Sequence, residues 1–239
     1  WYLDLVHPGW YGMISDNYSY VMPLPLKKKW GVTYALQPRL TQQLGVFSRN
    51  EITGERLKNF IDHIPADVKY LDLNINYSNR IDNTGLPFVP SKNYELKLNH
   101  SHHEIEKRYT QNIKRNIKKS VPFIEIFEEP QIPDFIRLKR ENANVKRSIE
   151  YFEWMNIFIE KLKLRGKGRI IGAGLNGKLV AAVFIAISDN RIYYLLPVSN
   201  ADGKKHRAMF GLIDYIIGKY EKTGMILDFE GSNIPGIAR

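Results

Sequence analysis

Cysteine is absent from the 239 residues of the chain. This absence excludes disulfide bonds, a thiolate nucleophile and a zinc site with cysteine ligands. The sequence also has no apolar run near the roughly 20 residues that a membrane-spanning helix needs, and no basic start followed by an apolar block, as in a signal peptide. We therefore expect a cytoplasmic protein. Because the sequence begins with Trp1 and stops at Arg239, soon after a glycine-containing stretch, we expect the native chain to extend beyond both residues.

Several catalytic motifs are also missing. The sequence contains no Ser-His-Asp order, no phosphate-binding P-loop and no glycine fingerprint for dinucleotides. Three histidines lie close together, at His100, His102 and His103, but no pattern of carboxylates accompanies them. A zinc site needs such supporting ligands, so we expect surface histidines and no metal site.

Positive charge is plentiful and unevenly distributed. The formal net charge is +10, and residues 96–239 hold 25 of the 35 basic and 16 of the 25 acidic side chains. This part therefore carries +9, against +1 for residues 1–95. Such asymmetry indicates an anionic partner, for example the phosphates of a co-substrate or RNA, although lysine and arginine also serve to solvate a surface.

The first half of the chain has the pattern of a small α/β unit, in which short apolar runs flank the turn-forming pair Asp16-Asn17. Residues 74–93 are polar and rich in turn formers, which indicates a connector. The elements predicted before it are strands at 11–15, 18–24, 31–36 and 68–73, and a helix at 51–64.

The second half gives the clearest structural signal, since two apolar runs flank Asn176-Gly177, the strongest marker of a tight hairpin turn. A second turn at Asp189-Asn190 predicts a third antiparallel strand, and the middle strand is apolar on both faces. The meander is predicted at 169–175, 178–187 and 191–197, followed by a polar loop at 199–207, a helix at 208–221 and a strand at 225–229. Before the meander, we predict strands at 94–98 and 123–127 and helices at 102–120, 134–142 and 148–164.

Each half contains a similar late strand, Leu71-Asp72-Leu73 in the first and Leu227-Asp228-Phe229 in the second. The shared order of elements indicates a duplicated α/β unit, or two units that are alike by chance. We predict an α/β (α+β) fold with mixed sheets flanked by helices. The expected domains are residues 1–95 and 96–239, the second with a basic helix at 102–120.

The order of meander, loop, helix and strand resembles the core of the GNAT acyltransferase superfamily, and the two halves resemble tandem GNAT-like units. The resemblance implies that the loop at 199–207 binds the pyrophosphate of an acyl-CoA through backbone amides and the dipole of the next helix. The loop has only one glycine, and the alternative is a solvated loop. The implied donor-binding residues are Asn200, Gly203, Lys204, Lys205, His206 and Arg207.

Three segments resemble the FemABX branch of peptidyl- and aminoacyl-transferases: residues 109–120, Arg147 with Tyr151, and residues 227–232 with 235–239. The first is similar to the helix that opens the family's second domain. Arg147 and Tyr151 stand where the family contacts a phosphorylated cell-wall precursor. The resemblance covers about the last 140 residues. The candidate substrate-binding residues are Asn112, Arg115, Asn116, Lys119, Arg147, Tyr151 and Ser232.

Residues 107–119 carry six basic and no acidic side chains. Arg108, Asn112, Arg115 and Lys119 fall on one face of the predicted helix by i, i+3 and i+4 spacing. Such a face binds phosphates or RNA, and the alternative is a solvated amphipathic helix. Because asparagine is a poor helix former, we expect Asn112 and Asn116 to form hydrogen bonds with a substrate or with neighbouring backbone.

Two carboxylates lie at the end of the last predicted strand, where open α/β sheets bind ligands. Strand alternation predicts that Asp228 and Glu230 point to the same side. Glu230 is the candidate general base for an attacking amine, and Asp228 is either a second catalytic group or a buried anchor of the loop. Tyr193 and Tyr194 point to opposite faces, and Tyr194 is the third catalytic candidate.

These observations predict an N-acyltransferase that moves an acyl or aminoacyl group to an amine, such as a small molecule, a peptide or a cell-wall precursor. Acyl-CoA or aminoacyl-tRNA would be the co-substrate, with no tightly bound cofactor, and tRNA is a candidate partner. The alternative is a non-catalytic module that binds RNA or a phosphate ligand through residues 107–119. A degenerate enzyme that has lost its acyl site is a third interpretation.

Overall fold

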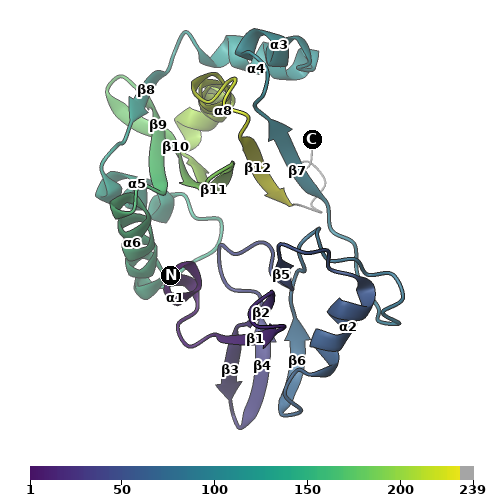
Figure 1. Ribbon diagram of the computed structural model, residues 1–239. Helices are drawn as coiled ribbons and strands as arrows, with labels where there is room; N and C mark the ends of the chain where they lie inside the picture. The colour runs from purple at the N-terminus through teal and green to yellow at the C-terminus, as the bar shows by residue number, and fades with distance from the viewer. Residues whose placement is uncertain (232–239) are drawn as a thin grey trace. The chain divides into compact units, whose positions relative to one another are not determined.

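The chain divides into two compact units, Trp1–Ser91 and Lys92–Arg239. The computed structural model describes residues 1–231 (Figure 1). The boundary predicted after residue 95 falls within strand β7 (Asn93–Lys97), whose partner strand belongs to unit 2. Among the helices of residues 1–231, none is long and apolar enough to cross a membrane.

Unit 1 contains two three-stranded sheets. In the first, β2 (Tyr20–Leu24) lies between β1 (Tyr11–Ser15) and β5 (Phe47–Ser48), and both pairings are antiparallel. In the second, β4 (Val32–Leu36) pairs antiparallel with β3 (Leu26–Lys29) and parallel with β6 (Val68–Asp72). The helices of this unit are α1 (Tyr2–Val6) and α2 (Gly54–Asp62).

The core of unit 1 forms around the apolar face of α2, where Leu57 and Phe60 cluster with Met22 and Leu24 of β2. Two buried asparagines fasten the polar connector to this core. Asn79 accepts from the backbone N–H of Val46 and donates to its carbonyl oxygen, each at 2.9 Å. Asn76 donates to the carbonyl oxygens of Leu44 and Val46. The connector predicted from its turn formers is therefore held by specific side-chain bonds.

Unit 2 is built on a six-stranded sheet in the order β7-β12-β11-β10-β9-β8 (Figure 1). All neighbours are antiparallel except β11 and β12, which are parallel. The central strand β10 is buried over most of its length. The bounds of the remaining strands are β8 (Glu125–Glu128), β9 (Gly168–Leu175), β10 (Lys178–Ile187), β11 (Arg191–Ser199) and β12 (Ile226–Gly231).

Helices cover both faces of this sheet. On one face, Phe158 of α6 (Ile149–Leu164) packs edge-on against Phe184 of β10, with ring centroids 5.9 Å apart. On the other face, α8 (Ala208–Lys219) buries Leu212 and Ile216 against β10 and its neighbours. Helix α5 (Ile132–Glu141) packs beside α6, and α4 (Gln111–Ser120) packs beside α8.

The helix predicted over residues 102–120 is two helices. Helix α3 (His102–Lys107) begins with a capping box, formed by Ser101 and Glu104, and ends at Lys107. Thr110 then takes an extended conformation, and its side chain accepts from the N–H of Ile113 to cap the new helix α4. Because a capping threonine competes with helix continuation, Arg108 does not share a helix with Asn112, Arg115 and Lys119.

The loop predicted at 199–207 also contains a short helix, α7 (Ala201–Lys205). Asn200 caps it by accepting a hydrogen bond from the N–H of Gly203 at 2.9 Å. Asparagine is one of the preferred residues at this position. The polar composition of the segment had suggested only a loop, because five residues are too few for a clear helical period.

Candidate functional site

The site is best located from the parallel strands β11 and β12. Their pairing joins Arg191 to Ile226, Ile192 to Leu227 and Tyr193 to Asp228. It stops there, although β11 continues to Ser199 and β12 to Gly231. In open α/β sheets, ligands bind beyond the carboxyl ends of such strands. The residues that follow Tyr193 and Asp228 are therefore the first candidates for chemistry.

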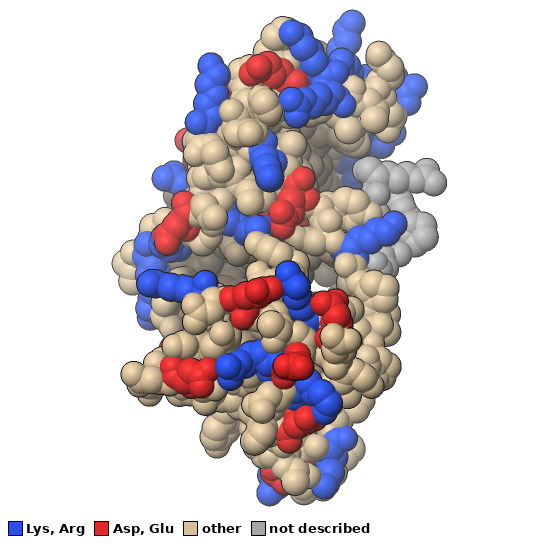
Figure 2. All heavy atoms as spheres, turned by 45° about the vertical axis from the view of Figure 1, so that its right-hand side comes forward, with Lys and Arg blue, Asp and Glu red and all other residues tan. Residues whose placement is uncertain are grey.

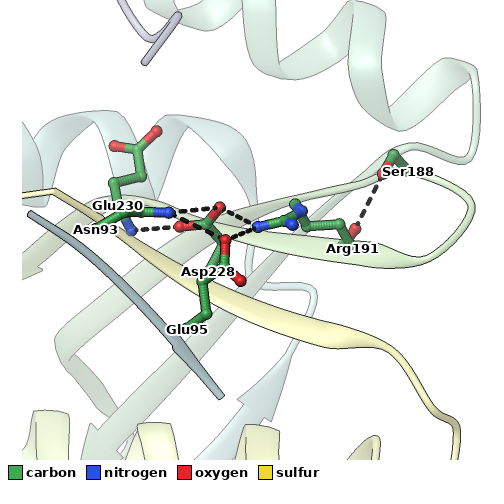
Figure 3. Close-up of polar contacts among 6 residues, drawn as sticks. All are labelled: Asn93, Glu95, Ser188, Arg191, Asp228 and Glu230. Atoms are coloured by element: carbon green, nitrogen blue, oxygen red, sulfur yellow. Dashed lines mark hydrogen bonds and ion pairs between the residues drawn. The ribbon is translucent and has the colours of Figure 1, made fainter. Parts of the chain in front are cut away.

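A buried ion pair links β11 to β12 where their pairing ends at Asp228. The Arg191 guanidinium donates to Oδ2 of Asp228 at 2.6 Å and also to Glu95 of β7 (Figure 3). Asp228 is only 1% exposed, and Asn93 donates to the same Oδ2 at 3.4 Å. Burial on its own would lower the pKa of Arg191, but the bonds to Glu95 and Asp228 raise it above its ordinary value. Asp228 is thus held as a paired carboxylate in the sheet.

Glu230 occupies an unusual backbone position two residues later. Its φ is +60°, and the pairing of β12 with β7 shifts register between Asp228 and Gly231. The N–H of Glu230 donates to Oδ1 of Asp228 at 2.8 Å. A left-handed residue at a bulge breaks the alternation of side chains along a strand. The expectation that both carboxylates share one side is therefore wrong, and Figure 3 shows the Glu230 carboxylate turned away from the Asp228–Arg191 pair.

The environment of Glu230 favours its protonated form. The side chain is partly buried, and no cation among residues 1–231 pairs with it. Burial, followed by the nearby Asp228 carboxylate, raises the pKa of Glu230 to about 7. A carboxylate of this kind is matched to proton transfer near neutral pH.

Tyr194 lies on the other face of the sheet. Arg191 and Tyr193 share the face of Asp228, whereas Ile192 and Tyr194 pack with the core that α8 covers. The Tyr194 ring lies 5.7 Å from that of Phe229, and burial raises the pKa of its hydroxyl. The structure therefore does not bring Tyr194 to the Asp228 carboxylate. A bulge with Leu196 at φ +51° follows it in β11.

The predicted donor-binding residues form the turn between β11 and α8. Lys204, Lys205 and Arg207 are exposed, and His206 is partly buried against Phe123 at a ring distance of 4.9 Å. Arg207 takes a left-handed φ of +57° at the start of α8. The first backbone amides of a helix have no acceptor within it and attract anions. Basic side chains and the start of a twelve-residue helix therefore meet at this turn.

Two members of the predicted set already have structural tasks in this turn. The N–H of Gly203 is bonded to the cap residue Asn200. Gly203 is buried against β10, and a Cβ at this position would lie 2.4 Å from the carbonyl oxygen of Val180. The single glycine of the segment therefore permits close packing of α7 on the sheet. Its role in binding a donor stays a prediction.

The predicted substrate-binding residues of α4 contact one another. Oδ1 of Asn112 accepts from Arg115 at 3.0 Å and from Asn116 at 3.4 Å. These bonds between side chains compensate for the low helix propensity of asparagine, where we had expected a substrate or the backbone. Asn116 is buried, whereas Arg115 and Lys119 are exposed.

Arg147 and Tyr151 lie at the start of α6, where the guanidinium is 5.3 Å from the ring centroid of Tyr151. Such a cation–π contact fixes both side chains near each other. The remaining prediction, Ser232, lies outside the described residues. Within residues 1–231, no group of His, Asp and Glu side chains is arranged to hold a metal ion.

Sequence reasoning missed Arg191, Glu95 and Asn93. Arg191 carried a usable signal, because it is the one charged residue between the Asp189-Asn190 turn and the apolar part of the strand. A buried charge needs a partner, and Asp228 was available in the neighbouring parallel strand. Glu95 and Asn93 gave no such signal, since both belong to an ordinary alternating edge strand.

Comparison with known protein families gives a match that lies within unit 2. Residues 107–233, just over half of the chain, match the acetyltransferase (GNAT) domain family. No curated protein matches the chain in sequence.

Solved structures share the fold of the chain at low sequence identity. FemX has a TM-score of 0.65 at 11% identity, covering 98% of this chain and 83% of FemX. A conserved protein of unknown function from Bacteroides thetaiotaomicron has a TM-score of 0.61 at 12% identity, covering 99% and 81%. L-PGS from Bacillus licheniformis has a TM-score of 0.59 at 12% identity, covering 98% and 72%. The predicted fold class, mixed sheets flanked by helices in tandem GNAT-like units, is confirmed.

Proposed function

The chain belongs to the GNAT acetyltransferase domain family, and on this premise we propose that unit 2 is an N-acyltransferase core with Glu230 as its general base. The fold shared with FemX favours the FemABX-like branch. One observation supports the proposal above others: Glu230 is partly buried, unpaired with any cation of the described chain, and placed just beyond the last β11–β12 pair.

In this proposal the Glu230 carboxylate removes a proton from the acceptor amine as its nitrogen attacks the acyl carbon. A C–N bond forms, and the bond from the acyl carbon to sulfur or oxygen of the donor breaks. The leaving thiolate or alkoxide takes up a proton, so that charge and atoms balance. Asp228 does not transfer the proton, because Arg191 and Glu230 N–H already occupy its oxygens. It positions the Glu230 backbone.

We propose acyl-CoA or aminoacyl-tRNA as the donor, since both are polyanions that suit the start of α8. Lys204, Lys205 and Arg207 supply positive charge there, and Ala208 and Met209 supply first-turn amides. Charged side chains at the positive end of a helix oppose its dipole unless an anion is bound. Both donors occur in the cytoplasm, which is the proposed location.

The acceptor is proposed to be an amine on an anionic small molecule or peptide, such as a cell-wall precursor. Arg147, with Tyr151 stacked against it, offers a charged donor for a phosphate or carboxylate. Arg115 and Lys119 of α4 and Ser232 complete the proposed set of acceptor contacts.

The direct test has two arms, the binding of acetyl-CoA and of aminoacyl-tRNA by calorimetry, and transfer to amine acceptors. We expect one donor to bind and to lose affinity in Lys205→Glu and Arg207→Glu, while Glu230→Gln retains binding and loses transfer. If neither donor binds the intact chain, or if Glu230→Gln transfers at the wild-type rate, the proposal is wrong.

A second candidate function is binding of RNA or a phosphate ligand without catalysis, favoured by the basic segment 107–119, which comprises the end of α3 and most of α4. Lys107, Arg108, Arg115, Lys118 and Lys119 are exposed, with no acidic residue in 107–119. The upper part of Figure 2 shows several Lys and Arg side chains close together, with fewer Asp and Glu side chains among them.

A salt titration of RNA binding separates the two candidates. Phosphate contacts give a logarithmic slope of about −0.7 for each one on single strands. If binding is the whole function, Arg115→Glu with Lys119→Glu removes it, and no transfer is found. Lys178→Glu, an exposed lysine at the Asn176-Gly177 hairpin, is the matched control and should leave binding unchanged.

A further inference from the structure

The hairpin that joins β3 to β4 ends in an exposed tryptophan. Lys29 pairs with Val32, so Trp30 and Gly31 form a two-residue turn. Trp30 is 90% exposed. Its ring contacts the Lys29 ammonium, which lies 4.4 Å from the ring centroid. An aromatic side chain this large is normally buried, because it removes far more apolar area from water than most residues.

The backbone at Trp30 makes its presence more unusual. The φ angles are +51° at Trp30 and +79° at Gly31, the combination of a type I′ turn. This turn strongly prefers Asn-Gly or Asp-Gly, because bulky residues with a Cβ are strained at positive φ. Trp30 therefore gains little from burial within the fold and sits in a strained conformation. Such residues are retained where their side chain is used.

Charge around the tip is of one sign. Lys27, Lys28 and Lys29 are all exposed, and no acidic residue occurs in residues 17–50. The Asp67 carboxylate, from the segment before β6, accepts from Thr33 of β4 at 2.9 Å. Val32 adds an exposed apolar side chain opposite Lys29. The tip thus combines the exposed Trp30 ring with the three charged groups of the flexible lysine side chains.

We propose that this hairpin tip docks unit 1 onto the surface of a bilayer that contains anionic phospholipid. Tryptophan favours the interface between headgroups and acyl chains, where its ring is in an apolar setting and its N–H remains wet. Lysine stems extend beside it and place their ammonium groups on phosphates. A two-residue convex tip has no concave surface to enclose a nucleic-acid strand, and Val32 gains nothing from base stacking, so a bilayer is favoured over RNA.

The test uses the whole chain with two vesicle types, phosphatidylcholine alone and phosphatidylcholine with phosphatidylglycerol, in sedimentation assays. We expect binding to the anionic vesicles that weakens with salt, with a blue shift of tryptophan emission. Changing all three lysines to Gln should lower the partition constant by about fivefold for each lysine. Trp30→Asn should lower it roughly tenfold and abolish the blue shift, because the apolar wedge is lost.

Trp30→Asn also separates docking from folding. Because Asn-Gly suits a type I′ turn, this variant should melt at a higher temperature than the wild type while binding vesicles more weakly. Tyr18→Ala is the matched control. Tyr18 is 71% exposed and also has positive φ in a hairpin turn of unit 1, but Asp16 and no lysine accompany it. It should bind like the wild type.

Three results with vesicles would overturn the proposal: equal binding to both vesicle types, vesicle binding that survives Trp30→Asn unchanged, or an equal loss of binding in Tyr18→Ala. Loss of single-stranded RNA binding in Trp30→Asn, without any vesicle binding by the wild type, would also overturn it and assign the tip to nucleic acid. Acyl transfer is not part of the readout, so this proposal and the catalytic one stand or fall separately.

Discussion

The backbone N–H of Glu230 donates a hydrogen bond to Oδ1 of Asp228 at 2.8 Å. The two carboxylates of strand β12 therefore have different tasks. Arg191 neutralises Asp228, which in turn fixes the backbone at Glu230. The Glu230 carboxylate is left without a cation in the described chain, and burial with the Asp228 charge raises its pKa to about 7.

The first prediction concerns catalysis. Replacing Glu230 by Gln should lower kcat by about 10²–10⁴-fold, the usual contribution of a general base. Because only the deprotonated base accepts a proton, wild-type activity should rise with pH through about 7. The variant should lack this limb of the profile. Glu125→Gln, at an exposed position of β8, is the control and should keep it.

The second prediction concerns stability at the same residue. The pKa of Glu230 is raised from 4.5 to about 7 in the folded state, so the stability present below pH 4.5 is lost as pH rises through 7. Glu230→Gln should therefore be more stable than the wild type at pH 8, by about 2 kcal/mol after allowance for partial exposure. At pH 4 the two should be equal. If the urea midpoints of wild type and Glu230→Gln differed by the same amount at pH 4 and pH 8, this linkage would be contradicted.

The third prediction concerns the buried ion pair. Arg191→Met leaves Asp228 buried without its cation and should lower the free energy of unfolding by about 3–5 kcal/mol. Adding Asp228→Asn to that variant should recover much of the loss, since the uncompensated charge is gone. Arg169→Met is the control, because its contact with Glu129 is long, at 3.8 Å, and exposed. Its effect should stay within about 1 kcal/mol.

The fourth prediction compares two glycines of α8. A Cβ at Gly211 would lie 2.6 Å from Ser120 Oγ of α4 and from Ile124 Cδ1, whereas the nearest atom to one at Gly218 is 3.7 Å away. Gly211→Ala should force the Ser120 and Ile124 side chains out of their positions and destabilise by about 1–3 kcal/mol. Gly218→Ala should stabilise by about 0.5–1 kcal/mol, because alanine is the better helix former. Thermal denaturation of both variants checks the sign of each change.

Much of the fold was predictable where local and long-range forces agree. Residues 178–187 form a strand with the predicted bounds, because the apolar run and the Asn176-Gly177 turn both specify it. Residues 102–120 were predicted as one helix because the apolar stripe continues across Arg108 to Thr110. Thr110 instead caps a new helix, so the segment forms two helices despite the continuous apolar pattern. Threonine before a helix is a recognised start signal, but inside a longer periodic segment the sequence does not show whether it begins a new helix.

The sequence singled out two acidic residues of the candidate site but did not predict how their side chains are arranged. Asp228 and Glu230 were singled out from their place at a strand end. The burial of Asp228 and its bond to the Glu230 N–H favour the anchor over the catalytic alternative. The side of Glu230 depends on a positive φ at a bulge, which no local sequence rule specifies for glutamate. The role of Arg191 depends on which strands become neighbours, and that is decided by the whole sheet.

Three ladder pairs join β11 to β12 in the described sheet, and the Arg191–Asp228 ion pair links the same two strands. The sheet of unit 2 is therefore two blocks, β8 to β11 and β12 with β7, joined along a short seam. Parting the seam breaks these ladder pairs and the ion pairs of Arg191, while the ladders inside each block stay intact, so local opening takes less free energy than global unfolding. Amide exchange should accordingly be faster at Leu227 than at Val183 in the middle of β10.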